Sequence, residues 1–219
     1  MRIAIAGAGN VGRAIARELL ENGHHVLLID RDPKSLKMES VPAAEWLLAD
    51  ACEIASLDNA KLDGCQVLVA ATGDDKVNLV CSLLAKTEYG VPRVVARVNH
   101  PKNEWLFDSS WGVDVAVSTP RIISALVEEA VSVGDIVRLF SLRKGEANLV
   151  EITLPDSAQV CGKTIDEISF PSNSSLAAIV RDGQVISPAP HMLLASGDEL
   201  LFVATSSAEA ELKSCLLGN

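Results

Sequence analysis

The stretch Ile3-Ala4-Ile5-Ala6-Gly7-Ala8-Gly9-Asn10-Val11-Gly12 decides the fold of this 219-residue chain. Four apolar residues, typical of a buried strand, lead into a G-x-G-x-x-G loop, and residues 11–21 then show apolar positions at helical spacing. A second apolar run at 26–29 ends in Asp30, about eighteen positions past the last glycine and close to the usual spacing of about twenty. This order predicts a dinucleotide-binding βαβ unit.

Each glycine of the loop has a physical role in such a unit. Gly7 permits the tight turn, Gly9 lets the backbone approach a pyrophosphate, and Gly12 lets the helix pack close to the strand. The phosphates would then face backbone N–H groups at the positive end of the helix, where Asn10 and Val11 lie. The alternative is a tight βα turn that binds nothing.

Asp30 is the candidate for the ribose, because a carboxylate can accept hydrogen bonds from its hydroxyl groups. The same charge would repel a 2′-phosphate. The sequence therefore favours NAD or an adenosine polyphosphate over NADP, although the neighbouring cation Arg31 works against this preference.

Composition excludes several classes of function. The chain is 48% hydrophobic with few aromatics, and its net charge of −10 argues against nucleic acid or anionic lipid as a partner. No apolar run is long enough to span a bilayer, and the early glycine loop leaves no room for a signal peptide, so we expect a cytoplasmic protein. Five scattered cysteines without a C-x-x-C pair predict free thiols.

Strand and helix patterns alternate through the first half, which predicts a Rossmann-like, doubly wound parallel sheet. We expect short helices at 33–38 and 101–106, and a long apolar helix over 122–131 that Pro120 opens, with its continuation past Gly134 to about Leu142 left open. A polar break at 144–148 precedes short alternating strands and a terminal helix. The expected domains are an α/β domain, residues 1–134, and a small α+β domain, residues 135–219.

Polar residues follow several strands at the edge where an open α/β sheet binds its ligand. Asp50 is expected either to contact the adenine side or to cap the next helix. Asp74 is expected to cap a helix and Asp75 to be a solvated acid rather than half of a catalytic pair. Arg97 is a candidate for phosphate, with a structural ion pair as its alternative.

The sequence contains few of the residue patterns typical of hydride-transfer enzymes. The single tyrosine, Tyr89, is not part of a Tyr-x-x-x-Lys pair, and no spacing of histidines and cysteines is typical of a metal site. We therefore predict no catalytic residue and no metal ligand, and we favour a binding protein. The alternative is a small NAD-dependent oxidoreductase.

The chain resembles the RCK (KTN) domains, the cytosolic regulators of potassium channels and transporters. The resemblance is carried by the glycine loop, Asp30 and the segments 49–51, 71–78, 95–101, 111–114 and 118–120 in the first half. In the second half it is carried by 162–168, 178–183 and 197–202, which resemble the RCK C-terminal module. One module of each kind in one chain is similar to the regulatory subunits of Trk potassium uptake systems, and we expect an actinobacterial member.

The resemblance implies a regulatory subunit that binds NAD(H), ATP or ADP and leaves cyclic di-AMP open as a ligand of the C-terminal module. It also implies a homo-oligomer (a dimer, a tetramer or a larger ring) on the inner face of the cell membrane, held there by a TrkH-like potassium-translocating subunit. Two positions depart from the family pattern: Asn10 replaces an arginine of some ATP-binding relatives, and Arg121 an acid. The predicted nucleotide-binding residues are Gly7, Gly9, Asn10, Val11, Gly12, Asp30, Arg31, Asp50, Ala51, Thr72, Gly73, Asp74, Asn78 and Arg97.

Overall fold

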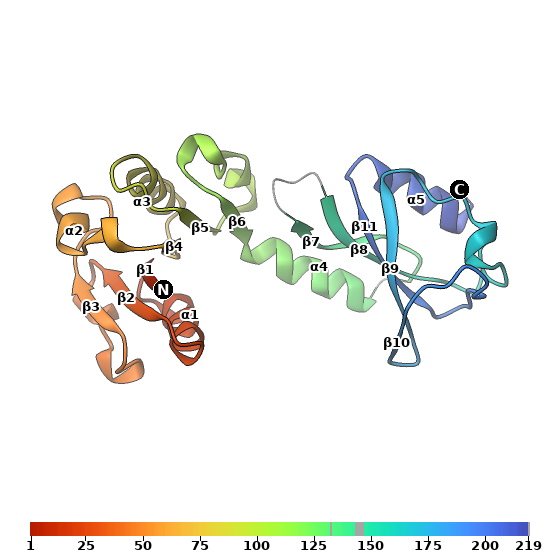
Figure 1. The fold of residues 1–219 in the computed structure, drawn as a ribbon, viewed down its shortest axis with the longest axis horizontal. Helices are drawn as coiled ribbons and strands as arrows, with labels where there is room; N and C mark the ends of the chain where they lie inside the picture. The colour runs from red at the N-terminus through yellow and green to blue at the C-terminus, as the bar shows by residue number, and fades with distance from the viewer. Residues whose placement is uncertain (132, 143–146, 219) are drawn as a thin grey trace. The chain divides into compact units, whose positions relative to one another are not determined.

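The computed structural model describes residues 1–131, 133–142 and 147–218. They form two compact units, Met1–Pro120 and Arg121–Asn219 (Figure 1). This division groups the helix that follows Pro120 with the second unit, whereas our boundary after residue 134 counts that helix with the first. The position of the domain boundary therefore stays a prediction.

The first unit contains a six-stranded, wholly parallel sheet with the strand order β3-β2-β1-β4-β5-β6. Its strands are β1 (Arg2–Ala6), β2 (His25–Asp30), β3 (Glu45–Leu48), β4 (Val67–Ala70), β5 (Arg93–Val98) and β6 (Val115–Ser118). The order reverses between β1 and β4, which makes the carboxyl ends of these two strands the switch point of a doubly wound sheet. The predicted Rossmann-like fold is confirmed.

Three helices accompany this sheet: α1 (Asn10–Glu21), α2 (Ile54–Asn59) and α3 (Asp75–Thr87). The short helices expected at 33–38 and 101–106 are 3₁₀ helices. The first is divided into two single turns, η1 (Pro33–Ser35) and η2 (Met38–Ser40), and the second is η4 (Pro101–Leu106).

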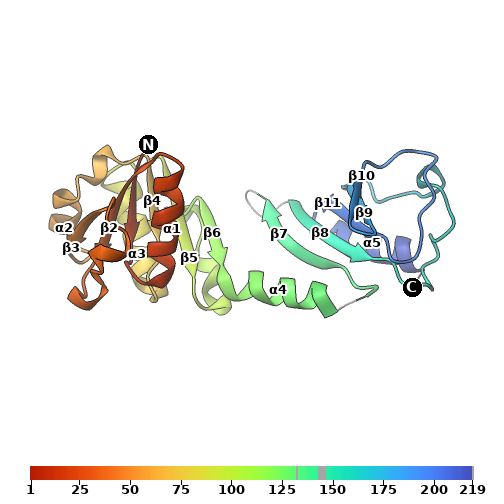
Figure 2. The same ribbon diagram turned by 90° about the horizontal axis from the view of Figure 1, so that it is seen from below.

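Both faces of the first sheet are covered, as the continuous apolar strands require. Alternate residues of β1 point to opposite faces: Ile3 and Ile5 pack with the α1 residue Ala16, whereas Ala4 and Ala6 belong to the cluster that contains Leu57 of α2 and residues of α3. Helix α1 lies in front of the strands in Figure 2. The sheet is thereby held rigidly while its strand ends stay accessible.

The second unit contains a five-stranded antiparallel sheet with the order β10-β9-β11-β8-β7. Its elements are α4 (Thr119–Val131), β7 (Val137–Leu142), β8 (Ala147–Thr153), 3₁₀ helix η7 (Ile165–Glu167), β9 (Ser174–Arg181), β10 (Gln184–Ile186), β11 (Glu199–Ala204) and α5 (Ala208–Leu217). Residues of α5 and of the strands share one core with Phe202, whose ring meets Phe170 edge-on at a centroid distance of 5.3 Å.

The predicted continuation of the apolar helix to Leu142 was wrong. Helix α4 ends at Val131, Gly134 takes a positive φ of 83°, and residues 137–142 form β7, paired with β8. A left-handed glycine stops a helix, and the apolar residues beyond it then bury themselves in a sheet instead. The polar break predicted at 144–148 falls mainly on residues 143–146, which lie outside the described residues.

The most buried charge of the second unit is Asp198, whose side chain is fully buried. It accepts hydrogen bonds from Arg181 Nε at 2.6 Å, from Arg181 Nη2 at 2.7 Å and from the backbone of Ala195 at 2.8 Å. Burial alone would raise the pKa of Asp198, but the bonds from Arg181 and Ala195 hold it below its ordinary value. The carboxylate is thus closed off by its own partners.

Candidate functional site

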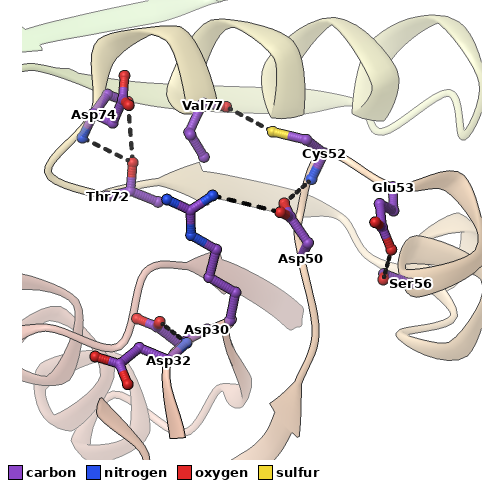
Figure 3. Close-up of polar contacts among 10 residues, drawn as sticks. Asp30, Asp32, Asp50, Cys52, Glu53, Ser56, Thr72, Asp74 and Val77 are labelled. Atoms are coloured by element: carbon purple, nitrogen blue, oxygen red, sulfur yellow. Dashed lines mark hydrogen bonds and ion pairs between the residues drawn. The ribbon is translucent and has the colours of Figure 1, made fainter. Parts of the chain in front are cut away.

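A pocket of about 600 Å³ opens at the carboxyl ends of the parallel strands in the first unit. Its walls come from the glycine loop, the ends of β2, β4 and β5, the residues after β3, and the start of α3. Figure 3 shows how Asp30, Asp50, Thr72 and Asp74 gather there. The lining residues are Gly7, Gly9, Asn10, Val11, Ile29, Asp30, Arg31, Ser35, Ala49, Asp50, Ala51, Ala71, Thr72, Gly73, Asp74, Val77 and Arg97.

The glycine loop is shaped by two close backbone approaches. Gly7 has a positive φ of 106°, and a Cβ there would lie 2.9 Å from the backbone of Ala71 and Thr72 at the end of β4. A Cβ on Gly12 would lie 1.9 Å from the carbonyl oxygen of Gly7. Gly9, in contrast, faces open space. The loop therefore packs tightly behind and leaves its front free for a ligand.

Helix α1 begins at the loop, with Gly9 as its N-cap residue, and no described side chain caps it. The first-turn N–H groups of a helix have no partner within the helix, so this end offers donors and a partial positive charge to an anion. Asn10 and Val11 lie at this end and line the pocket. The arrangement fits a phosphate group.

Asp30 is held at the pocket by backbone donors. Its carboxylate accepts from the N–H of Ala8 at 2.8 Å and from the N–H of Asp32 at 2.9 Å. The first bond fixes the acid to the glycine loop across the β1–β2 pair, so the candidate ribose acceptor and the candidate phosphate cradle are positioned together. A carboxylate retains further lone pairs for ligand hydroxyls after these two bonds.

Asp50 is not the cap of helix α2, since that helix starts at Ile54 with Glu53 as its N-cap residue. The Asp50 carboxylate instead accepts from the N–H of Cys52 at 2.9 Å and lies 3.6 Å from Arg31 Nη1. Both Asp50 and Arg31 line the pocket, so this ion pair, which follows β2 and β3, forms part of the pocket wall.

Asn78 lies behind the pocket wall and is fully buried. Its Oδ1 accepts from the backbone N–H of Thr72 at 2.9 Å and from the Thr72 hydroxyl at 2.7 Å, and its Nδ2 donates to the carbonyl of Arg97 at 2.8 Å. Asn78 does not line the pocket itself. It ties the end of β4 to the end of β5 and so fixes two walls of the pocket.

Asp75 was predicted to be a solvated acid, and this was wrong: it is only 8% exposed. Its carboxylate accepts from Asn99 N at 2.7 Å, Asn99 Nδ2 at 3.0 Å, His100 N at 3.0 Å and Asn103 Nδ2 at 2.8 Å. Burial alone would raise its pKa, but these donors together hold the pKa below its ordinary value. Asp75 thus joins the first turn of α3 to the segment after β5. Asp74 caps α3 as predicted, accepting from Lys76 N at 2.9 Å.

Arg97 reaches the pocket from the end of β5. Its Nε is buried without a hydrogen-bond partner, and the described part of the chain contains no ion pair of Arg97. The structural alternative, an ion pair, is therefore not what the described residues form. A buried donor without an acceptor is costly, and a phosphate oxygen would satisfy it.

All predicted site residues except Gly12 and Asn78 line one pocket, and these two support its walls. Reasoning from sequence missed Ile29, Ser35, Ala49, Ala71 and Val77 as lining residues. Three of the five, Ile29, Ala49 and Ala71, lie at a strand end or directly after one, a position that could have flagged them; Ser35, in η1, and Val77, in α3, carry no such signal.

The thiols have no activating surroundings. Burial raises the pKa of Cys52, Cys65, Cys161 and Cys215, and that of Cys81 still further. Raised thiol pKa values mean little thiolate at neutral pH, the reactive form. Among the described residues no group of histidine, cysteine and acidic side chains could hold a metal ion, and no helix is long and apolar enough to cross a membrane.

Comparison with known families agrees with this geometry. Residues 3–119 match the TrkA-N domain model, and residues 149–216 match the TrkA-C domain model. The chain belongs to the TrkA family. It is 56% identical to the Trk system potassium uptake protein TrkA of Mycobacterium tuberculosis, with 99% of each chain covered, which confirms the expected actinobacterial kinship. It is 29% identical to a TrkA homolog of Methanothermobacter thermautotrophicus over 96% of this chain and 97% of the relative.

Solved structures with this fold include the GsuK channel bound to NAD, with a TM-score of 0.67 and 17% identity over 98% of this chain and 39% of the channel. Another is the Kef C-terminal domain of Shewanella denitrificans in its AMP-bound form, with a TM-score of 0.52 and 24% identity over 59% of this chain and 79% of that domain. At these identities the likeness shows the fold that this TrkA-family chain shares with them.

Proposed function

We propose that the chain is a nucleotide-sensing regulatory subunit of a Trk-type potassium uptake system and that its pocket binds an adenine nucleotide, NAD(H) or ATP/ADP. The observation that carries the proposal is the convergence, in one pocket, of an uncapped helix start, the fixed carboxylate of Asp30 and the unpartnered Nε of Arg97. These groups match a phosphate, a ribose and a second phosphate contact. The assignment to a Trk potassium uptake system rests on the similarity to the TrkA relatives.

In this proposal, different pocket residues contact different parts of the nucleotide. The glycine loop and the start of α1 take the pyrophosphate, Asp30 the ribose, and Asp50, Ala51 and Arg31 the adenine side. Thr72, Gly73, Asp74 and Arg97 face the part of the ligand beyond the pyrophosphate. Two solved structures with this fold hold an adenine nucleotide, NAD in the GsuK channel and AMP in the Kef domain, which supports this choice of ligand class.

The regulatory step follows from the buried contacts around the pocket. Asn78 and Asp75 connect the pocket loop at 72–74 to the end of β5 and to the segment 99–103. A ligand that pulls on Arg97 or Thr72 therefore acts on a large part of the unit. Only a nucleotide that binds two arrangements of the assembly with different affinity can shift their populations, and ligands of different length would do so differently.

A homo-oligomer is part of the proposal. Helix α4 presents apolar side chains to solvent: Ile123, Leu126 and Val127 are 57%, 53% and 58% exposed, and Val131 is exposed as well. A contiguous apolar face of this kind marks an interaction surface. A second copy of the chain, offering the same helix, is the occupant we propose, and light scattering of wild type against Leu126→Asp tests it. A wild type that stays monomeric at micromolar concentration would contradict this element.

The membrane partner in this proposal is a TrkH-like potassium-translocating subunit on whose cytoplasmic side the chain acts. The net charge of −10 suits basic cytoplasmic loops, with salt screening the attraction. A pull-down with the detergent-solubilised transporter and potassium flux into vesicles, with and without the chain, test this partner. A chain that neither co-purifies nor changes nucleotide-dependent flux would overturn the regulatory role.

The binding site is tested with Gly9→Val. Since a Cβ at Gly9 meets open space, the variant should fold normally, and its side chain should occupy the place of the pyrophosphate. Calorimetry with NADH, ATP, ADP and cyclic di-AMP should show at least tenfold weaker binding of the ligand that wild type prefers. Unchanged affinity for every ligand would remove the site assignment. Turnover of NADH with small substrates would favour the alternative, an NAD-dependent oxidoreductase.

A further inference from the structure

Arg13, in the second turn of α1, is a buried cation: its residue is only 8% exposed. Its Nη1 donates to the carbonyl oxygen of Ala8, and its Nη2 donates to Asn10 Oδ1 at 2.7 Å. Both acceptors belong to the glycine loop, and both are neutral. Within the described ranges, 1–131, 133–142 and 147–218, no carboxylate forms an ion pair with Arg13.

A buried charge that meets only neutral dipoles is expensive, because dipoles replace only part of the hydration that the ion has lost. Buried guanidinium groups are ordinarily balanced by a carboxylate, as Arg181 is by Asp198 in the second unit. Arg13 lacks such a partner. The missing negative charge is therefore expected from outside the chain, at a point close to the loop that Arg13 contacts.

The position of Arg13 defines where that charge would lie. Asn10 lines the pocket, and the carbonyl that Arg13 holds is that of Ala8, whose N–H is bonded to Asp30. Arg13 thus stands behind the phosphate cradle and does not line the pocket. Arg97, with its unpartnered Nε, lines the same cavity from β5, two strands away from β1 in the sheet. Two cations at separate places around the cavity favour a ligand whose negative charge is spread over more than one group.

We propose that Arg13 is a specificity-determining and positioning residue: its buried charge acts through the glycine loop and makes the pocket select adenine nucleotides by the negative charge of their phosphates. The inference rests on the proposed nucleotide site and adds the selected ligand class, adenosine di- and triphosphates over the monophosphate. Arg13 does this without touching the ligand, since a charge in a low-dielectric wall is screened far less than one at the surface.

Arg17, one turn further along α1, provides the matched control. It is exposed, and its Nε donates to the carbonyl of Ser40 at 3.2 Å. Arg17→Gln removes the same charge from the same helix, but at a solvated position. AMP, ADP and ATP are titrated by calorimetry, without divalent cations, into wild type, Arg13→Gln, Arg13→Lys and Arg17→Gln, and the melting temperature of each variant is recorded.

The proposal expects Arg13→Gln to weaken ATP binding at least tenfold and AMP binding at most about threefold, so that the ratio of the two affinities falls. Arg13→Lys keeps the charge, so its ratio should stay within about threefold of wild type, and so should that of Arg17→Gln. If Arg13→Gln does not fold, the wild-type affinities decide, because similar affinities for AMP and ATP would contradict selection by phosphate charge. A rescue of the ratio by lysine separates charge from the hydrogen-bonding geometry of the guanidinium group.

Two results would overturn the proposal. An equal loss for AMP, ADP and ATP in Arg13→Gln would make Arg13 a structural support of the loop, and an equal change in Arg17→Gln would make the effect one of net charge. In both cases the nucleotide site itself would stand. Failure of wild type to bind any of the three nucleotides, or NADH, would instead remove the proposed function.

Discussion

The buried charge of Asp198 in the second unit and that of Arg13 in the first are balanced in opposite ways. In the second unit, Asp198 and Arg181 neutralise each other, and the backbone of Ala195 completes the set. In the first unit, Arg13 has no carboxylate partner among the described residues and Arg97 keeps an unbonded Nε, and both stand beside a cavity. The comparison indicates that buried polar groups that satisfy one another stabilise the fold. Cations beside a cavity that lack an acidic partner instead favour the binding of an anionic ligand.

The largest loss of stability is expected from breaking the ion pair of Asp198 and Arg181. Asp198→Ala leaves Arg181 without its partner, which costs about 3 kcal/mol, the lower end for buried pairs because the Arg181 side chain is 35% exposed. Urea unfolding measures the loss. Since the site lies in the first unit, nucleotide affinity should not change. A variant that loses nucleotide affinity while it remains folded would contradict the separation of the two units.

Gly12→Ala tests the tight packing behind the loop of the first unit. The new Cβ would lie 1.9 Å from the Gly7 carbonyl oxygen, so the helix or the loop must shift, at about 2–3 kcal/mol. Gly9→Ala is the control, because its Cβ meets open space and its φ of −67° suits alanine. Urea unfolding of the two variants should differ by most of that amount. Equal stabilities would show that the contact does not constrain the loop.

Asp75→Asn tests the support of the pocket. The substitution removes a carboxylate that accepts four hydrogen bonds and should cost about 2 kcal/mol at pH 7. Because the pKa of folded Asp75 lies below its ordinary value of 3.8, its stabilisation is fully present above that value and is lost as the pH falls through the lowered pKa.

Urea unfolding of wild type and Asp75→Asn between pH 7 and pH 3 checks this sign. The difference between them should shrink only below about pH 4, where the unfolded carboxyl begins to bind its proton. A difference that is constant down to pH 3 would mean that ionisation of Asp75 contributes nothing to stability.

The smallest effect concerns selection at Asp30. A 2′-phosphate would meet its carboxylate, so NADP(H) should bind about tenfold more weakly than NAD(H), a difference of about 1.4 kcal/mol. Calorimetry in one buffer compares the two dissociation constants. Asp30→Asn should reduce the ratio. Equal or tighter binding of NADP(H) to wild type would direct attention to Arg31, which lies in the same pocket.

The sequence predicted the parallel sheet and most of the pocket lining because both follow from local patterns. Apolar runs identify strands buried on both faces, and residues at their carboxyl ends must meet at one edge of the sheet. Asp75 was misjudged because its four donors come from residues 99–103, whose approach depends on tertiary packing. Arg13 was not singled out for the same reason. Its burial and its two neutral acceptors depend on the fold, and in the sequence it is an ordinary arginine of a helix.

The predicted continuation of the apolar helix to Leu142 was wrong for a different reason. Residues 137–142 have apolar positions that suit either a helix or a buried strand, and periodicity cannot distinguish the two over so short a run. Gly134, with its positive φ, decides the matter in favour of a stop. The pairing of β7 with β8 then fixes the segment as a strand.

The central place of β1 has a consequence for how the chain is made. Strand β1 is synthesised before the other strands of its sheet, yet in the sheet it lies between β2 and β4, and β4 begins only at Val67. The glycine loop must therefore wait, with one edge of its strand unpaired, until more than sixty further residues have been synthesised. The antiparallel hairpin of β9 and β10, by contrast, can close as soon as its turn has emerged. The first strand of this sheet thus gains its second neighbour only after two later strands, β2 and β3, have been synthesised.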